Sequence, residues 1–405
     1  MGGAFPPPQL LEDPYPFYRM LRGAQPVFRV PVGDAASPGV WILTRYRDVQ
    51  QTLKDARFSV DRRHAQIVQQ YADQLPMRAA LGEGGGLRSM LVMDPPDHTR
   101  VRGLVSKAFT PRRVAALRPR IEATVATLLG EVGGAREFDL MESFAAPLPA
   151  IVIAELLGVP PEDHRQFKEW SSALVTAVGA GNPLAGSEQF EKALAQLLDY
   201  LRGVIAERRR APREDLISAM IEAQEERDAL TDAELLATSN LLLLAGHETT
   251  TNLIGNGMLA LLRHPDELAR LRADRALLRS AVEELLRFDS PVQATARVAL
   301  ADVAYGDATV PAGALVMTGI GAANRDPEAF ADPDRLDLGR AENHHLSLGY
   351  GAHFCLGAPL ARLEGEIAFG ALLDRFPHLA LASDTVKHRA NFVLRGLESL
   401  PLRVG

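Results

Sequence analysis

Residues 344–364 read HHLSLGYGAHFCLGAPLARLE, and they contain Cys355, the single cysteine of this 405-residue chain. Gly349, Gly351 and Gly357 surround this cysteine and allow the backbone to come close to a flat partner. Helix-forming sequence starts directly afterwards, so the free N–H groups and the positive dipole end of that helix lie near the sulfur. Such surroundings favour the thiolate, which is the form of cysteine that binds a metal. The stretch therefore predicts a metal-binding thiolate.

Other chemistries of a lone cysteine fit this stretch less well. A small buried hydrophobe is the commonest fate of a free cysteine, but it would not need the glycines. A nucleophilic thiol would want a base, and His353 lies too close in an extended turn to reach the geometry of such a pair. A zinc site lacks paired ligand spacing, because His344, His345 and His353 crowd one loop. A dinucleotide loop lacks its third glycine, since Phe354 holds that place.

The stretch SLGYGAHFCLG resembles the haem-thiolate loop of the cytochrome P450 family, written F-G-x-G-x-H-x-C-x-G. The matching positions are Gly349, Gly351, His353, Cys355 and Gly357. Leu348 stands where the family commonly has phenylalanine, a difference that bears on the reduction potential of the haem. The resemblance implies that Cys355 ligates the iron of haem b, and thiolate ligation favours O–O cleavage.

Cationic side chains are expected to pair with the two haem propionates, because buried carboxylates need charged partners. In DPPDHTRVR (residues 94–102), His98 and Arg102 are four residues apart and share one helix face. They match the H-x-x-x-R helix of the family. The resemblance also implies this role for Arg297, in PVQATARVA, and for His353. His345 is a weaker candidate for the same neighbourhood.

The segment EELLR supplies Glu284 and Arg287, which match the E-x-x-R pair of the family. A spacing of three places both side chains on one helix face. In the family this pair locks the irregular segment before the cysteine, together with an arginine. Arg340 is our candidate for that arginine, with Arg335 as the alternate, and the role is structural.

The segment LAGHETTTN belongs to a long predicted helix. Six side chains of this helix are expected on one of its faces: Leu241, Leu244, Ala245, Glu248, Thr249 and Asn252. Thr249 can bond the carbonyl of Ala245 beside Gly246, which predicts a local opening or π-bulge. The segment matches the A-G-x-D/E-T pattern of the family. This resemblance implies that Thr249 hydrogen-bonds dioxygen while Glu248 relays protons from bulk water.

Substrate contacts can be mapped only by family position. They are Leu241, Leu244, Ala245, Val292, Gln293 and Leu394. Gln293 would be the polar handle that orients a ligand, and Leu184 would belong to a lid that opens for entry. Family members without an anchor oxidise terpenes, macrolides, steroids and fatty acids, many of them in secondary metabolism, and nothing in the sequence chooses among these.

The coarse pattern predicts a mainly α protein with a smaller β part (α+β), folded as one domain over residues 1–405. An early hairpin is expected in residues 26–60 and mostly helix from about 98 to 290. Thr231 and Glu234 form a candidate capping box for the longest helix, and Pro265 marks its end. An irregular segment over 325–342 precedes a final helix and a strand-like tail.

The composition of the chain limits the classes of binding partner that we expect. The net charge of −7 argues against wholesale nucleic-acid binding, and no run approaches the roughly 18 apolar residues of a membrane span. No flavin or iron–sulfur motif is present, so electrons are expected from a ferredoxin or flavodoxin with its NAD(P)H reductase. We expect a cytoplasmic monomer that uses O2 and an apolar small molecule. The rival functions are a peroxide-using haem-thiolate enzyme and a haem sensor or carrier.

Overall fold

The computed structural model describes residues 8–31, 38–70, 88–107, 109–160, 163, 166–167, 169–170, 173–174, 188–225 and 230–405. The candidate lid residue Leu184 and the glycine-rich loop at 82–86 lie outside these ranges. The α-helices are α1 (Pro8–Glu12), α2 (Tyr15–Ala24), α3 (Tyr46–Lys54), α4 (Gln66–Gln70), α5 (Asp97–Ser106), α6 (Pro111–Ala116), α7 (Arg118–Val132), α8 (Pro147–Leu157), α10 (Glu188–Arg210), α11 (Leu216–Glu225), α12 (Asp232–Arg263), α13 (Pro265–Ala273), α14 (Leu278–Phe288), α15 (Ile320–Ala323) and α16 (Ala358–Arg375).

The strands are shorter. They are β1 (Val27–Val30), β2 (Val40–Leu43), β3 (Phe58–Ser59), β4 (Glu137–Asp139), β5 (Ala294–Ala299), β6 (Val303–Tyr305), β7 (Ala308–Val310), β8 (Leu315–Gly319), β9 (Leu379–Leu381) and β10 (Pro401–Val404). Short 3-10 turns are η1 (Arg62–His64), η3 (Met90–Val92), η6 (Arg275–Leu277) and η7 (Gly351–His353), and η4 (Met141–Ala145) is a π-helix.

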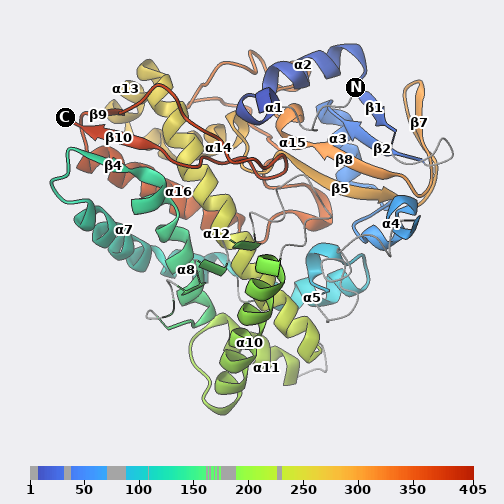
Figure 1. Ribbon diagram of the computed structural model, residues 1–405, viewed down its shortest axis with the longest axis horizontal. Coiled ribbons are helices and arrows are strands. Elements are labelled where there is room, and N and C mark those ends of the chain that lie inside the picture. Colours follow the sequence, from blue (N-terminus) through green and yellow to red (C-terminus); the bar gives the residue numbers. More distant parts are fainter. Residues whose placement is uncertain are drawn as a thin grey trace.

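Helix α12 crosses the centre of the molecule and is the axis on which the other helices pack (Figure 1). Its 32 residues span about 48 Å at the usual helical rise. The predicted capping box is confirmed: the Thr231 amide donates to Glu234 Oε2 at 2.8 Å, and the Glu234 amide donates to Thr231 Oγ1 at 3.1 Å. The helix ends at Arg263, before Pro265. Most of its residues are buried, and these include polar side chains such as Thr251, Asn252 and Asn256.

The main sheet lies to one side of this helical body and has the strand order β1-β2-β8-β5-β3 (Figure 1). The predicted early hairpin is confirmed as the antiparallel pair β1 and β2. Strand β2 then pairs with β8 in parallel, and β5 joins β8 antiparallel. The strand-like tail forms a second sheet, in which β10 lies between β4 and β9.

The predicted helices agree with the structure except at one point. Residues 112–132 were expected to form one helix, but α6 ends at Ala116 and α7 begins at Arg118. Pro119 lies in the first turn of α7, where its missing N–H costs no intrahelical bond. Among the described residues, no helix is long and apolar enough to cross a membrane.

Candidate haem-thiolate site

The loop before Cys355 is shaped by its glycines. Gly349 and Gly351 have φ angles of 76° and 72°, which other residues adopt only with strain. A Cβ on Gly351 would lie 2.9 Å from the carbonyl oxygen of Leu53. These two glycines thus serve the turn and its contact with α3. The Cys355 amide closes the loop by donating to the Leu348 carbonyl at 2.8 Å.

The thiol of Cys355 sits just ahead of α16, as its sequence position predicts. Its side chain is exposed, although protein surrounds it closely enough that burial raises the pKa of the thiol. The backbone N–H groups of Gly357 and Ala358 and the charges of Arg102 and Arg362 act in the opposite direction and lower this pKa. These groups would stabilise a thiolate once a cation is bound to it.

Four cationic or titratable side chains gather beside this loop from three separate stretches. The rings of His98, on α5, and His353, on η7, lie 4.0 Å apart between centroids. Arg102 donates from Nη2 to the carbonyl of Phe354 at 2.6 Å. Burial, and then the neighbouring His98, Arg297 and Arg102, hold the pKa of His353 at about 3, and burial lowers the pKa of Arg297 to about 10. The cluster thus supplies two guanidinium charges, of Arg102 and Arg297, and two imidazole rings that can donate hydrogen bonds.

On α12 the side chains divide into two groups. Ala245 is exposed and Leu241, Leu244 and Thr249 are partly exposed, although most of the helix is buried. Thr249 donates to the Ala245 carbonyl at 2.8 Å, as predicted. The prediction of a local opening or π-bulge is wrong, because α12 is α-helical from end to end. A Cβ on Gly246 would lie 3.0 Å from Ile153, so this glycine allows close packing of α12 on α8.

Glu248, the acid of the expected acid–alcohol pair, is buried, whereas its neighbour Thr249 is partly exposed. Asn252 is buried as well. The Glu248 carboxylate forms an ion pair with Arg389 and accepts a long hydrogen bond of 3.5 Å from Asn252. Arg389 holds this carboxylate in place in the observed structure.

Two of the predicted substrate contacts meet each other. Val292 and Leu394 form an antiparallel bridge, and both are partly exposed. Leu394 belongs to a hairpin, residues 388–397, that packs along α12, where Asn256 Nδ2 donates to the Arg395 carbonyl at 3.0 Å. The hairpin therefore reaches the same helix that carries Ala245 and Thr249.

Gln293 has a different role from the predicted one. Its side chain is 2% exposed, and its Oε1 accepts a hydrogen bond from Tyr18 at 3.0 Å. Its Nε2 donates to the Ser290 carbonyl at 2.8 Å and to the Tyr15 hydroxyl at 3.3 Å. Gln293 thus fastens helix α2, and the structure does not support it as a substrate contact.

Comparison with known proteins agrees with this geometry. A family model described as Cytochrome P450 matches residues 40–399. The chain belongs to the cytochrome P450 family. Cytochrome P450 107B1 of Saccharopolyspora erythraea is 44% identical over 398 residues, which cover 97% of this chain and 96% of that protein. The vitamin D(3) 25-hydroxylase of Pseudonocardia autotrophica is also 44% identical, over 97% and 94% of the two chains.

Solved structures give the same result for the fold. Myxobacterial cytochrome P450 CYP267B1 in complex with myristic acid superposes with a TM-score of 0.89 at 40% identity, covering 99% of this chain and 100% of that one. The chain therefore has the P450 fold, and it is a P450 monooxygenase whose cofactor is haem b. Activity in this family requires O2 and electrons from a redox partner.

The residues beside the cysteine loop fit this cofactor. His98 Nε2 is buried and has no hydrogen-bond partner among the described residues. Arg297 is 8% exposed and donates to the Ala296 carbonyl, with no ion pair in the part of the chain that the structure describes. Two propionate carboxylates would supply the acceptors and the negative charge that these cations need.

The E-x-x-R pair forms the buried lock that the sequence predicts. Glu284 and Arg287 are 0% exposed and 2.8 Å apart. Arg340 Nε lies 3.1 Å from Glu284 Oε2, which confirms Arg340 over Arg335. Arg287 also donates to the carbonyls of Asn324, Pro333 and Arg335, so the pair fixes the irregular segment of this P450.

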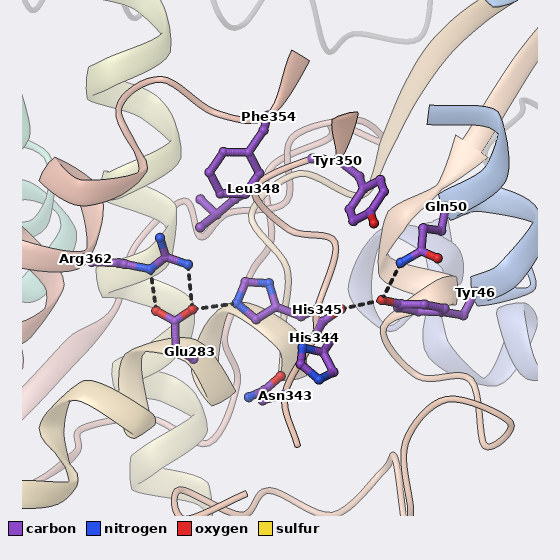
Figure 2. Close-up of a pocket in the computed structure, with 11 residues that line it drawn as sticks. Tyr46, Gln50, Glu283, Asn343, His344, His345, Leu348, Tyr350, Phe354 and Arg362 are labelled. Atoms are coloured by element: carbon purple, nitrogen blue, oxygen red, sulfur yellow. Dashed lines mark hydrogen bonds and ion pairs between the residues drawn. The ribbon is translucent and has the colours of Figure 1, made fainter. Parts of the chain in front are cut away.

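His345 does not join the cationic cluster, contrary to the weaker prediction. Its Nε2 lies 3.2 Å from Glu283 Oε2, and Glu283 in turn pairs with Arg362 (Figure 2). Sequence reasoning missed Glu283, Arg362 and Arg389 altogether. Glu283 adjoins the E-x-x-R motif and Arg362 follows Cys355 by two helical turns, so motif position could have drawn attention to both. No local signal points to Arg389.

Proposed function

We propose that this P450 inserts one atom of O2 into an apolar small molecule, by hydroxylation or epoxidation, with electrons from a separate redox partner. The observation that carries the proposal is the juxtaposition of the single thiol with the guanidinium groups of Arg102 and Arg297 and the imidazole rings of His98 and His353, which come from distant stretches of the chain. This donor set suits a dianionic group with a metal at its centre.

Cys355 would ligate the haem iron, and His98, Arg102, Arg297 and His353 would hold the propionates. When bound, the haem supplies the redox centre at which dioxygen is activated. The loop holds the sulfur through the bond from the Cys355 amide to Leu348. The backbone N–H groups at the start of α16 and the charge of Arg102 would favour the ionised sulfur once the iron is bound.

Proton delivery is assigned to Thr249 and Glu248. The Thr249 hydroxyl is on the accessible side of α12 and would hydrogen-bond the dioxygen being activated. Glu248 would bring protons from bulk water, but its carboxylate must first leave Arg389, which now holds it. Arg389 is itself partly exposed, so this ion pair lies between the buried carboxylate and the solvent.

The substrate would contact the partly exposed apolar side chains of α12 and of the Val292–Leu394 bridge. These are Leu241, Leu244, Ala245, Val292 and Leu394. Vitamin D(3) and myristic acid, named for a relative and for a solved structure, are both largely apolar. The five side chains offer no charged group, which fits a ligand of this kind.

Electrons would come from a ferredoxin or flavodoxin with its NAD(P)H reductase, and the enzyme would act as a cytoplasmic monomer. The chain has one cysteine, which cannot hold an iron–sulfur cluster. A separate partner is therefore the simplest source of electrons. The acid–alcohol pair favours this reading, because peroxide-using haem-thiolate enzymes often lack the pair and a haem sensor or carrier needs no proton relay.

The experiment that tests the proposal starts with the carbon monoxide difference spectrum of the reduced, haem-loaded protein, which should show the band of thiolate ligation. NADH consumption and product formation are then compared with surrogate ferredoxin and reductase, and with peroxide alone. Product should form with the redox partners. Turnover confined to peroxide would favour the peroxide-using enzyme, and absence of turnover with both would favour the carrier.

Replacing Thr249 with alanine should uncouple the reaction. We expect the ratio of peroxide released to product formed to rise on the order of 10-fold, since a hydroxyl that guides proton transfer is lost. Thr127→Ala is a matched control, because Thr127 is exposed on α7 and makes the same bond to its i−4 carbonyl, at 3.0 Å. Peroxide and product are measured per NADH. Unchanged coupling in Thr249→Ala would refute the assignment.

A further inference from the structure

A pocket of about 360 Å³ opens on the side of the cysteine loop where α14 and α16 meet it. Its lining includes Leu348 and Phe354 from the loop, and Glu283, His345 and Arg362 (Figure 2). The last three side chains point toward one another in Figure 2 and form one charged network. The function proposed above makes no use of this network.

Glu283 is the centre of the network. Arg362 donates from Nε to one carboxylate oxygen at 2.6 Å and from Nη2 to the other at 2.8 Å, a bidentate pair. Burial acts to raise the pKa of Glu283, but the hydrogen bonds from His345 and Arg362 outweigh it and bring this pKa to about 2. The carboxylate is therefore ionised at neutral pH and holds the guanidinium in one orientation.

His345 connects this carboxylate to the loop that carries the thiol. The Ser347 amide donates to His345 Nδ1 at 3.2 Å, so the ring proton sits on Nε2 and points to Glu283. Ser347 also donates from its hydroxyl to the Leu286 carbonyl at 2.6 Å. The loop, α14 and α16 are thereby joined through one carboxylate, and Arg362 cannot move without disturbing all three.

Arg362 lies beside the loop that carries the sulfur. It is the fifth residue of α16, seven residues after Cys355, and it lines the same pocket as Phe354, which directly precedes that cysteine. Glu283 partly neutralises this guanidinium and fixes its distance from the sulfur. A change in either charge should therefore alter how strongly the site favours a negative charge on the sulfur and the metal.

We propose that Glu283 and Arg362 are a positioning pair that sets the electrostatic field at Cys355, and with it the reduction potential of the bound haem. The proposal rests on ligation of the haem by Cys355. Reduction adds one negative charge to the haem, so a nearby positive charge raises the potential and a negative charge lowers it. His345 contributes by holding the carboxylate against the loop.

The test uses single and double substitutions in the haem-loaded protein. In Glu283→Gln the charge of Arg362 is no longer balanced, and the midpoint potential should rise. In Arg362→Gln the charge of Glu283 remains, and the potential should fall. Each equilibrium constant for reduction should change about tenfold, which is 59 mV for one electron. The double variant should return close to the wild-type value.

Spectroelectrochemical titration at fixed pH and ionic strength measures these potentials, after a carbon monoxide difference spectrum of every variant. Glu366→Gln is the matched control, because it breaks another ion pair of α16, with Arg118 at 3.0 Å, and should leave the potential unchanged. Shifts in the same direction for both single variants, or no shift with the thiolate band intact, would overturn the inference. A wild-type protein without that band would overturn the proposed function together with it.

Discussion

Replacing Glu284 with glutamine is expected to lower the free energy of unfolding by about 3–5 kcal/mol, the range for breaking a buried ion pair by removing one partner. Glu284 accepts two hydrogen bonds from Arg287, at 2.8 Å each, and further bonds from Arg340. It also accepts from the Asp337 amide at 3.0 Å and from Asn343 at 3.1 Å. A neutral glutamine cannot satisfy these donors, because one of its two terminal atoms is itself a donor.

Urea unfolding followed by circular dichroism would measure this loss, provided that the slope with denaturant stays constant. Arg340→Gln is a milder companion, since Glu284 keeps Arg287 and the loss should be smaller. Glu366→Gln is the control at a partly exposed ion pair and should cost less than about 1 kcal/mol. A loss of that small size in Glu284→Gln would contradict the role of Glu284 as the buried lock.

The second large effect is expected for Cys355→Ser. The hydroxyl is a poor substitute for a thiolate, so the reduced protein should lose the carbon monoxide band of thiolate ligation, and product formation with redox partners should fall to background. Retention of that band in Cys355→Ser would exclude this sulfur as the ligand. The fold should persist, because serine is close to cysteine in size and the side chain is exposed.

The single cysteine also allows an independent test by chemical labelling. Every thiol adduct must be on Cys355, and its exposure in the protein without haem predicts reaction with a maleimide. Haem loading should protect it, because a ligated sulfur has no free lone pair facing solvent. Equal labelling of the two forms would contradict ligation.

Sequence reasoning reached the features that local chemistry determines. The capping box of Thr231 and Glu234, the end of α12 before Pro265 and the glycine-rich loop all depend on residues close together in the chain. The buried lock was also predicted correctly, including the choice of Arg340, because the motif and the resemblance together restricted the candidates.

The predictions that were wrong share one physical cause. Each of these residues contacts another residue that lies far away in the sequence. The sequence suggests that Gln293 is free to orient a ligand, but Tyr15 and Tyr18 are hydrogen-bonded to it in the structure. It also suggests that His345 contacts a propionate, but the ring of His345 lies against Glu283. Glu248 turns to Arg389, 141 residues further on. Nothing within a helical turn of these residues reveals such contacts, since they arise only when helices and hairpins pack.

The contacts of helices α1 and α2 have a practical consequence for shortened versions of the chain. Arg395 donates to the carbonyls of Leu11 and Glu12 and pairs with Asp289, whose carboxylate accepts from Tyr15. Deletion through Tyr18 would remove these partners and leave the guanidinium of Arg395 and the carboxylate of Asp289 with fewer hydrogen bonds. Trimming of this segment would therefore loosen the hairpin that carries Leu394.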